Sequence, residues 1–150
     1  MKLQAIAILT FLIFENVMAQ ETTTAKYINS TDMEALKLTQ EWDKTFPQSD
    51  KVEHTKITFH NRYGITLAAD LYKPKNTQGR LAAIAVSGPY GAVKEQVSGR
   101  YAQTLAERGF LTIAFDPSYY GESGGTPRYL TSPEISTEDF SAAVDYLTSR

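Results

Sequence analysis

The stretch that decides the fold is LAAIAVSGPYGAVKEQVSGRYAQTLAERGFLTIAFDPSYYGESGG, residues 81–125. Its two continuously apolar runs, residues 81–86 and 110–115, are typical of strands that are covered on both faces of a sheet. A segment with helical spacing, residues 96–108, lies between them. Because a strand, a helix and a second strand in this order form a parallel pair with a right-handed crossover, the stretch predicts an α/β sheet.

Two helices are expected in this part of the chain. In the first, apolar residues recur every fourth position, and Gly109 follows where a helix C-cap favours positive φ. These recurring residues are Val97, Tyr101 and Leu105. The second helix is expected to begin near Ser136, with Asp139 in its first turn. Its shared apolar face would consist of Phe140, Val144 and Leu147.

An antiparallel hairpin is expected ahead of these elements. Ile57 and Phe59 alternate with polar neighbours, residues 61–64 supply turn chemistry, and the alternation resumes over residues 65–71. The predicted fold class is therefore α/β, with an antiparallel hairpin followed by parallel β-α-β-α elements.

Composition excludes several classes of function. The 150 residues, 42% of them hydrophobic, suffice for one domain with one core. The net charge is -2 and no basic block is present, so a nucleic-acid partner is not expected. The absence of cysteine excludes disulfides, thiolate metal sites and a thiol nucleophile within these residues. No phosphate-binding, dinucleotide or metal-ligand motif occurs, so we expect no cofactor and no metal.

The N-terminus is typical of a secretory signal peptide, residues 1–19. Lys2 gives a positive start, residues 3–14 are mostly apolar but too short to cross a bilayer, and Ala19 fits the small-residue position before a cut. We expect a periplasmic or secreted protein without a stable membrane span after processing. A retained anchor or a buried helix is the alternative interpretation.

Residues 20–50 are expected to form a polar leader and one amphipathic helix, followed by the α/β domain at residues 51–150. Thr31 and Glu34 match a capping box, and Pro47 would close the helix. Its apolar face would consist of Ala35, Leu38, Trp42 and Phe46.

Three blocks of sequence narrow the interpretation: SGPYGAVKEQ at residues 87–96, DPSYYGESGG at 116–125 and AAVDYL at 142–147. Over residues 55–150 the chain resembles the front half of α/β-hydrolases, in particular exported enzymes related to dienelactone hydrolases and X-Pro dipeptidyl-peptidases. The resemblance implies cleavage of an ester, amide or similar acyl bond in a small-molecule or peptide substrate. It also places the nucleophile, serine or cysteine, and the acid and histidine beyond residue 150.

The SGPYG loop is the best candidate for a catalytic role. Acyl transfer needs fixed N–H donors for an oxyanion, and in α/β-hydrolases one donor follows the third strand. Pro89 has no N–H, so the candidate donor is the backbone amide of Tyr90, with that of Gly91 as the runner-up. Gly88 stands where relatives often have histidine, which leaves open how the loop is braced. The alternative is a strand-to-helix turn without a catalytic role.

Ser123 lies in GESGG and matches the G-x-S-x-G pattern of a nucleophile elbow. An elbow needs a strand directly before the serine and a helix directly after it. The strand is expected to end near Phe115, and the residues after Gly125 contain two prolines and no helical period before about Ser136. We therefore interpret Ser123 as loop structure.

The remaining polar candidates are assigned no chemistry. Lys94 and Glu95 are interpreted as solvated or helix-capping charges, and Asp116 as a carboxylate that caps the turn after a strand. His54 and His60 are expected at the surface, about 20 Å apart on one strand and so too distant to share a metal.

Two functions from different classes remain. The first is the N-terminal part of an exported hydrolase, and the second is a non-catalytic exported binding or structural module. Against the second, a chain ending here would expose a long apolar strand edge, which is an aggregation hazard. No motif indicates the substrate or the oligomeric state.

Overall fold

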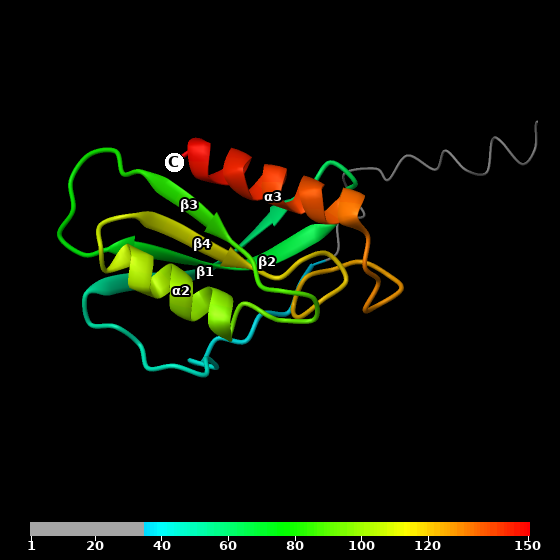
Figure 1. Ribbon diagram of the computed structural model, residues 1–150, viewed down its shortest axis with the longest axis horizontal. Helices are drawn as coiled ribbons and strands as arrows, with labels where there is room; N and C mark the ends of the chain where they lie inside the picture. The colour runs from blue at the N-terminus through cyan, green and yellow to red at the C-terminus, as the bar shows by residue number, and fades with distance from the viewer. Residues whose placement is uncertain (1–34) are drawn as a thin grey trace, which may run out of the picture. The chain divides into compact units, whose positions relative to one another are not determined.

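The computed structural model describes residues 35–150, which contain four strands and two helices (Figure 1). They are β1 (Val52–His60), β2 (Thr66–Pro74), β3 (Ala83–Val86), α2 (Val97–Ala106), β4 (Leu111–Phe115) and α3 (Pro133–Thr148). Neither helix of this part is long and apolar enough to cross a membrane. The signal peptide and most of the leader, predicted within residues 1–34, lie outside the described residues.

The strands form one mixed sheet in the order β1-β2-β4-β3. β1 pairs antiparallel with β2, β2 pairs antiparallel with β4, and β3 runs parallel to β4. The predicted fold class, a hairpin followed by parallel β-α-β-α elements, is therefore confirmed. The parallel pair places the carboxyl ends of β3 and β4 at the same edge of the sheet, where the loops that follow them meet.

One helix covers each face of the sheet (Figure 1). Successive residues of β4 point to opposite faces, so Ile113 and Phe115 pack on the α3 side while Ala114 packs on the α2 side. The other buried core residues on the α3 side are Phe59, Leu67, Ala69, Ala142, Ala143 and Leu147. Those on the α2 side are Val52, Tyr72, Ala102 and Ala106.

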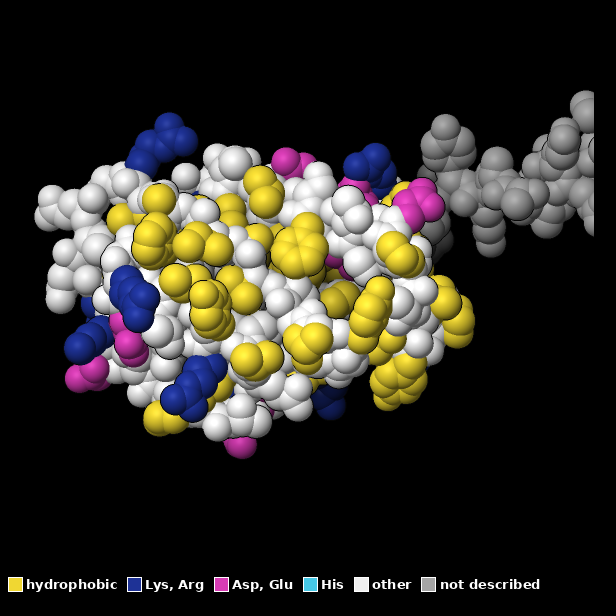
Figure 2. Space-filling view, in the orientation of Figure 1, with side chains coloured by type: hydrophobic (Ala, Val, Ile, Leu, Met, Phe, Trp, Pro, Cys, Tyr) yellow, Lys and Arg dark blue, Asp and Glu magenta, His cyan; other side chains and the backbone are white. Residues whose placement is uncertain are grey.

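The apolar run at residues 81–86 does form a strand, with Ala85 packed on the α3 side and Val86 on the α2 side of the sheet, but it is less buried than expected. β3 begins only at Ala83, and its residues are exposed or half-buried. The reason is its position, because β3 is the edge strand of the described sheet and is hydrogen-bonded on one side only. Hydrophobic side chains are accordingly visible at the surface between α2 and α3 (Figure 2).

The turn between β1 and β2 is built on a buried asparagine. The side-chain oxygen of Asn61 accepts hydrogen bonds from the backbone N–H groups of Tyr63 (3.1 Å) and Ile65 (3.0 Å). Its side-chain nitrogen donates to Asp139 on α3 (2.8 Å). The hairpin turn is therefore fixed both locally and against the helix that packs on the sheet.

The predicted first helix is confirmed, but the apolar spacing gives the wrong buried face. Val97 and Tyr101 are 59% and 62% exposed. The buried residues of α2 are instead Ser98, Gly99, Ala102, Gln103 and Ala106. Apart from Gln103, whose side chain bonds the backbone of Pro47 and Ser49, these residues are small, because the helix lies close to the sheet and leaves little space between them. Gly109 has φ +102°, as its predicted role at the helix end requires.

α3 begins three residues before the predicted start at Ser136. Ser132 is its N-cap, with a side-chain oxygen that accepts from the backbone N–H of Ile135 (3.4 Å), and Pro133 occupies the first turn. Phe140 and Val144 are 43% and 49% exposed, so the predicted apolar face is wrong at both positions. The buried face consists of Glu138, Asp139, Ala142, Ala143 and Leu147.

The amphipathic helix predicted to end before Pro47 is wrong within the described residues. Residues 35–50 have no helical structure. Tertiary contacts outweigh the local helical pattern: the backbone N–H of Thr45 donates to the carbonyl oxygen of Glu95 (3.0 Å), and the ammonium group of Lys44 lies 3.0 Å from Asp70 on β2. Within the segment, the indole N–H of Trp42 donates to the carbonyl oxygen of Phe46 (2.8 Å). The segment is an extended strap held by the loops and strands that it crosses.

Candidate active site

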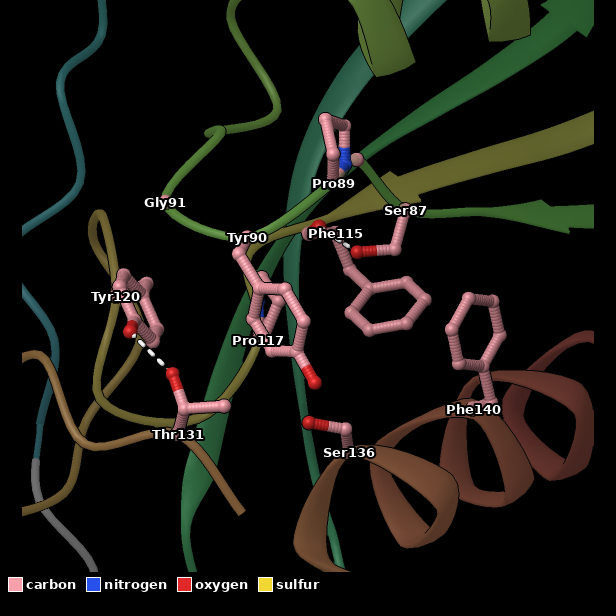
Figure 3. Close-up of a pocket in the computed structure, with 11 residues that line it drawn as sticks. Ser87, Pro89, Tyr90, Gly91, Phe115, Pro117, Tyr120, Thr131, Ser136 and Phe140 are labelled. Atoms are coloured by element: carbon pink, nitrogen blue, oxygen red, sulfur yellow. Dashed lines mark hydrogen bonds between the residues drawn. The ribbon is translucent and has the colours of Figure 1, made fainter. Parts of the chain in front are cut away.

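A cavity of about 250 Å³ opens where the loops after β3 and β4 meet the start of α3 (Figure 3). Its apolar wall consists of Pro89, Tyr90, Phe115, Pro117, Tyr120 and Phe140, and its hydroxyl groups come from Ser87, Thr131 and Ser136. Within the part of the chain that the structure describes, no charged side chain lines it. A concave, mostly apolar site with a few hydroxyl groups at the carboxyl ends of parallel strands is typical of a ligand site in an α/β sheet.

The loop after β3 forms a tight turn at the rim of this cavity. The backbone N–H of Ala92 donates to the carbonyl oxygen of Pro89 (3.0 Å), and Gly91 has φ +76°. A left-handed third residue is typical of a type II turn, which favours glycine there. Among the described residues, the N–H of Tyr90 has no hydrogen-bond acceptor. The turn therefore presents a free donor beside the cavity.

Gly88 shows how the loop is braced in the absence of a histidine. A Cβ atom on Gly88 would lie 2.7 Å from the Cβ atom of Ala92. The two ends of the turn therefore approach each other so closely that only glycine fits at position 88.

Aromatic contacts define the far wall of the cavity. The rings of Phe115 and Phe140 lie edge to face with centroids 5.0 Å apart. The hydroxyl groups of Tyr120 and Thr131 are 2.7 Å apart and hydrogen-bonded. Figure 3 shows the ring of Tyr90 directed across the cavity towards α3. Phe140 is thus exposed to the cavity rather than to the core, which explains its departure from the predicted buried face.

Ser123 is structural, as the sequence predicts. It is 1% exposed, its hydroxyl group donates to the carbonyl oxygen of Asp116 (2.7 Å), and its oxygen accepts from the backbone N–H of Ala68 (2.9 Å). No helix follows it directly, because α3 begins at Pro133. Both properties are incompatible with a nucleophile elbow.

Lys94 is the functional candidate that sequence reasoning missed. Its side chain is fully buried rather than solvated, and its ammonium group donates to Asp116 (2.8 Å) and Glu122 (2.7 Å) and contacts Glu95. Burial alone would lower the pKa of Lys94, but the charge and hydrogen bond of Asp116, with the bonds to Glu122 and Glu95, raise it above its ordinary value. The lysine is therefore charged at neutral pH.

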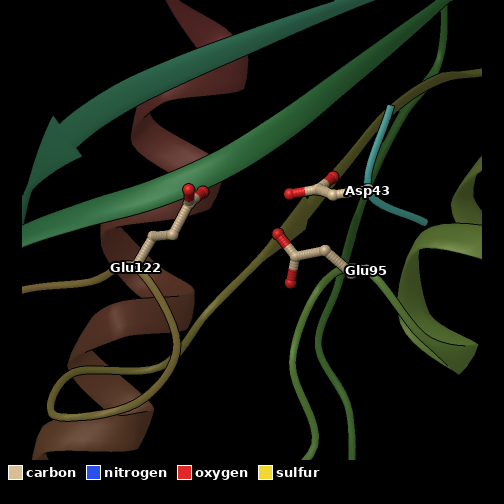
Figure 4. A group of neighbouring side chains, drawn as sticks. All are labelled: Asp43, Glu95 and Glu122. Atoms are coloured by element: carbon tan, nitrogen blue, oxygen red, sulfur yellow. The ribbon is translucent and has the colours of Figure 1, made fainter. Parts of the chain in front are cut away.

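Three carboxylates, of Asp43, Glu95 and Glu122, approach one another within 4.8 Å beside this lysine (Figure 4). Two ammonium groups already neutralise them: Lys56 lies 3.0 Å from both Asp43 and Glu122, and Lys94 contacts Glu95 and Glu122. Burial would raise the pKa of Glu122, but hydrogen bonds from Lys94, Thr39 and Lys56 lower it to about 2. Within the described residues, the cluster is a lysine–carboxylate network.

The same type of pairing joins the strap to β2. Lys44 lies 3.0 Å from Asp70, and both side chains are fully buried. His54 also binds Asp70 (2.8 Å) and packs against Trp42 with ring centroids 5.1 Å apart. The predicted surface position of His54 is therefore wrong, because its strand face is covered by the strap. His60 is exposed, as expected.

Asp116 caps the turn after its strand, as predicted, and it also binds the loop that follows β3. It is fully buried, and its two carboxylate oxygens accept from the backbone N–H of Lys94 (2.7 Å) and of Glu122 (2.9 Å). The only sequence signal for this arrangement is that lysine and aspartate both follow predicted strands. That signal places both loops at one edge of the sheet but does not show that the charges are buried.

Comparisons with known proteins agree with this architecture. The model of the X-Pro dipeptidyl-peptidase (S15) family matches residues 63–150. PA2218 of Pseudomonas aeruginosa is 69% identical over 127 residues, covering 84% of this chain and 34% of that protein. YcjY of Escherichia coli K12 is 52% identical over 100 residues, covering 64% of this chain and 33% of that protein. The chain spans about a third of the length of the curated relatives it matches.

Solved structures show the same fold. The crystal structure of PA2218 matches with a TM-score of 0.75 and 72% identity, over 77% of this chain and 36% of that one. Est1E of Butyrivibrio proteoclasticus, solved with ferulic acid bound, matches with a TM-score of 0.54 and 25% identity. The match covers 63% of this chain and 37% of that one. Because the family match covers more than half of its residues, this chain belongs to the X-Pro dipeptidyl-peptidase (S15) family and forms the N-terminal part of an α/β-hydrolase fold.

Proposed function

We propose that this chain is the N-terminal part of an exported hydrolase that cleaves an ester, amide or similar acyl bond by nucleophilic catalysis. The observation that carries the proposal is the N–H of Tyr90, which has no acceptor within residues 35–150 and lies on a tight turn at the rim of an apolar cavity. A donor fixed before the reaction stabilises an oxyanion more effectively than water does, because it needs no reorganisation. The nucleophile, acid and histidine belong to the residues after position 150.

The lining of the cavity supports an uncharged acyl group as the bound part of the substrate. The wall is formed by aromatic rings and prolines, and hydroxyl groups are its only polar side-chain groups. A charged group placed there would lose hydration without gaining a partner, which is unfavourable. Est1E was solved with ferulic acid bound, and the aromatic ring of that ligand is the kind of uncharged group that this lining suits.

Two substitutions at one position test the donor in the full-length protein. Tyr90→Pro removes the backbone N–H, and proline is favoured at the second position of a type II turn, so the turn is preserved. Tyr90→Ala removes the exposed ring and keeps the N–H. With 4-nitrophenyl acetate, Tyr90→Pro is expected to lower kcat by about 100-fold or more, as loss of one oxyanion donor does elsewhere. Tyr90→Ala should retain most of kcat.

Equal kcat values for the two variants would show that the Tyr90 amide is not the donor and would leave that of Gly91 as the candidate. No turnover by the full-length wild-type protein with 4-nitrophenyl, thioester and aminoacyl substrates would contradict the hydrolase proposal itself. Loss of turnover in Ser123→Ala without loss of stability would restore Ser123 as a nucleophile.

Export is tested separately. We propose that residues 1–19 are removed, on the basis of Lys2, the apolar residues 3–14 and the small residue Ala19. Mass spectrometry of the protein purified from the native host should identify Gln20 as the first residue. A mature protein that retains Met1 or Lys2 would contradict this part of the proposal.

A further inference from the structure

We propose that Lys94 and Asp116 are positioning residues that hold the Tyr90 turn in its catalytic geometry. This inference rests on the proposed function of the turn. It assigns a role to a buried ion pair that does not line the cavity and for which the sequence pattern predicts no catalytic role.

Both ends of the loop that carries Tyr90 are attached to the same strand. At the first end, Val86 of β3 pairs with Ala114 of β4. At the second end, the backbone N–H of Lys94 donates to Asp116, the residue directly after β4, over 2.7 Å. Residues 87–93 therefore lie between two attachments to the end of β4, and the position of the Tyr90 N–H depends on both.

The second attachment is charged and sealed from water. The side chains of Lys94 and Asp116 are fully buried, and the Lys94 ammonium group lies 2.8 Å from one Asp116 oxygen while the other oxygen binds the Lys94 backbone. One carboxylate thus holds both the main chain and the side chain of the same lysine. Because the charged pair is buried, the attachment is much less sensitive to salt than a surface ion pair would be.

A second buried pair in the same network provides the matched comparison. Lys44 and Asp70 are also fully buried, with 3.0 Å between the ammonium group and the carboxylate. This pair connects the strap to β2 and makes no contact with residues 87–93. If Lys94 serves only stability, removal of either lysine should have the same consequences. If Lys94 positions the turn, only its removal should impair turnover specifically.

The experiment compares Lys94→Met with Lys44→Met in the full-length protein, assayed with 4-nitrophenyl acetate well below both unfolding temperatures. We expect Lys94→Met to lower kcat by about 100-fold, the effect of one misplaced oxyanion donor, with KM changed by less than about 3-fold. Lys44→Met should lose a similar amount of thermal stability and keep kcat within about 3-fold. Equal losses of kcat in the two variants would overturn the proposal.

Asp116→Asn tests the same attachment with little change in shape. The amide oxygen can still accept from the Lys94 backbone, but the charge is lost and the amide nitrogen faces the ammonium group. The expected decrease in kcat is intermediate, about 10-fold, corresponding to partial loss of one donor. An unchanged kcat in a folded Asp116→Asn protein would count against the proposal.

Hydrogen exchange provides a measurement that does not depend on activity. In Lys94→Met and Asp116→Asn, the peptide covering residues 87–96 should exchange faster. The buried charge pair no longer holds residue 116 against the backbone of residue 94, so the hydrogen bonds made by the N–H groups of Ala92 and of residue 94 open more often. In Lys44→Met this peptide should exchange as in the wild type. Unchanged exchange in Lys94→Met would refute the positioning role. An inactive wild-type protein would instead refute the proposed function, and exchange would still decide whether Lys94 holds the turn.

Discussion

The tight packing of α2 on the loop that contains Lys94 makes a sharp prediction for Gly99→Ala. A Cβ atom at this position would lie 2.2 Å from the carbonyl oxygen of Lys94, 3.1 Å from the hydroxyl oxygen of Tyr72 and 3.2 Å from a ring carbon of Phe46. The first distance is to backbone and is roughly 1 Å too short for a normal contact. The helix or the loop must therefore move, because a carbonyl group cannot rotate away as a long side chain can.

The expected loss follows from two opposing effects. Forcing a methyl group into a close-packed site costs about 1–3 kcal/mol, and a backbone obstacle places Gly99 at the upper end of that range. Alanine gains about 1 kcal/mol over glycine within a helix. We therefore expect the free energy of unfolding of Gly99→Ala to fall by about 2 kcal/mol.

Urea unfolding of the full-length protein, followed by far-UV circular dichroism, measures this loss. Arg100→Ala, on the exposed side of the same helix, should change the free energy of unfolding by less than about 0.5 kcal/mol. Gly109→Ala has open space around the added methyl group but φ +102°, so it reports left-handed backbone strain alone, about 1–2 kcal/mol. A Gly99→Ala protein as stable as Arg100→Ala would refute the argument that close approach dictates glycine here.

Three further predictions concern the buried polar groups. Asp139→Ala should lower the free energy of unfolding by about 3 kcal/mol or more in urea titration, since it leaves three buried donors unpaired; a loss under about 1 kcal/mol would contradict this reasoning. The folded pKa values of Glu122 and Asp43 are lowered to about 2 from 4.5 and 3.8, so their stabilisation is complete above the unfolded values and is lost as the pH falls towards 2. Thermal melts across this range should show that decrease, whereas a flat profile would count against the network. Ser123→Ala removes two buried hydrogen bonds and should lower the free energy of unfolding by about 1–3 kcal/mol, which a lower thermal midpoint would show. Its kcat per folded molecule should be retained.

The order and pairing of the elements could be predicted from the sequence because they depend on local periodicity. Period-two alternation located the hairpin, and the apolar runs located β3 and β4. The buried helix faces could not be predicted in the same way, since hydrophobicity was the wrong criterion for α2. Size decided which side packs on the sheet: Gly99 and Ala102 fit close to the strands, whereas Val97 and Tyr101 do not.

The candidate site was predictable where it depends on the backbone and not where it depends on burial. The position of the Tyr90 turn follows from a strand, a proline and a glycine in sequence. The burial of His54 depends on the strap at residues 35–50, whose Trp42 packs against the His54 ring. The strap also binds the backbone of Glu95, the residue after Lys94, from a distant part of the chain. The helical pattern of apolar residues in that segment predicted a separate helix. In the structure, its Lys44 and Asp43 form ion pairs with the sheet.

The strap also sets a limit on how far the chain can be shortened from its start. A cut placed immediately before β1, at the edge of the regular structure, would remove one charged partner from each of two buried or nearly buried groups: Lys44 from Asp70, and Asp43 from Lys56. It would also uncover the aromatic ring of His54. The smallest unit that retains its electrostatic balance therefore starts no later than Thr39, whose backbone N–H binds Glu122, a dozen residues upstream of the first strand.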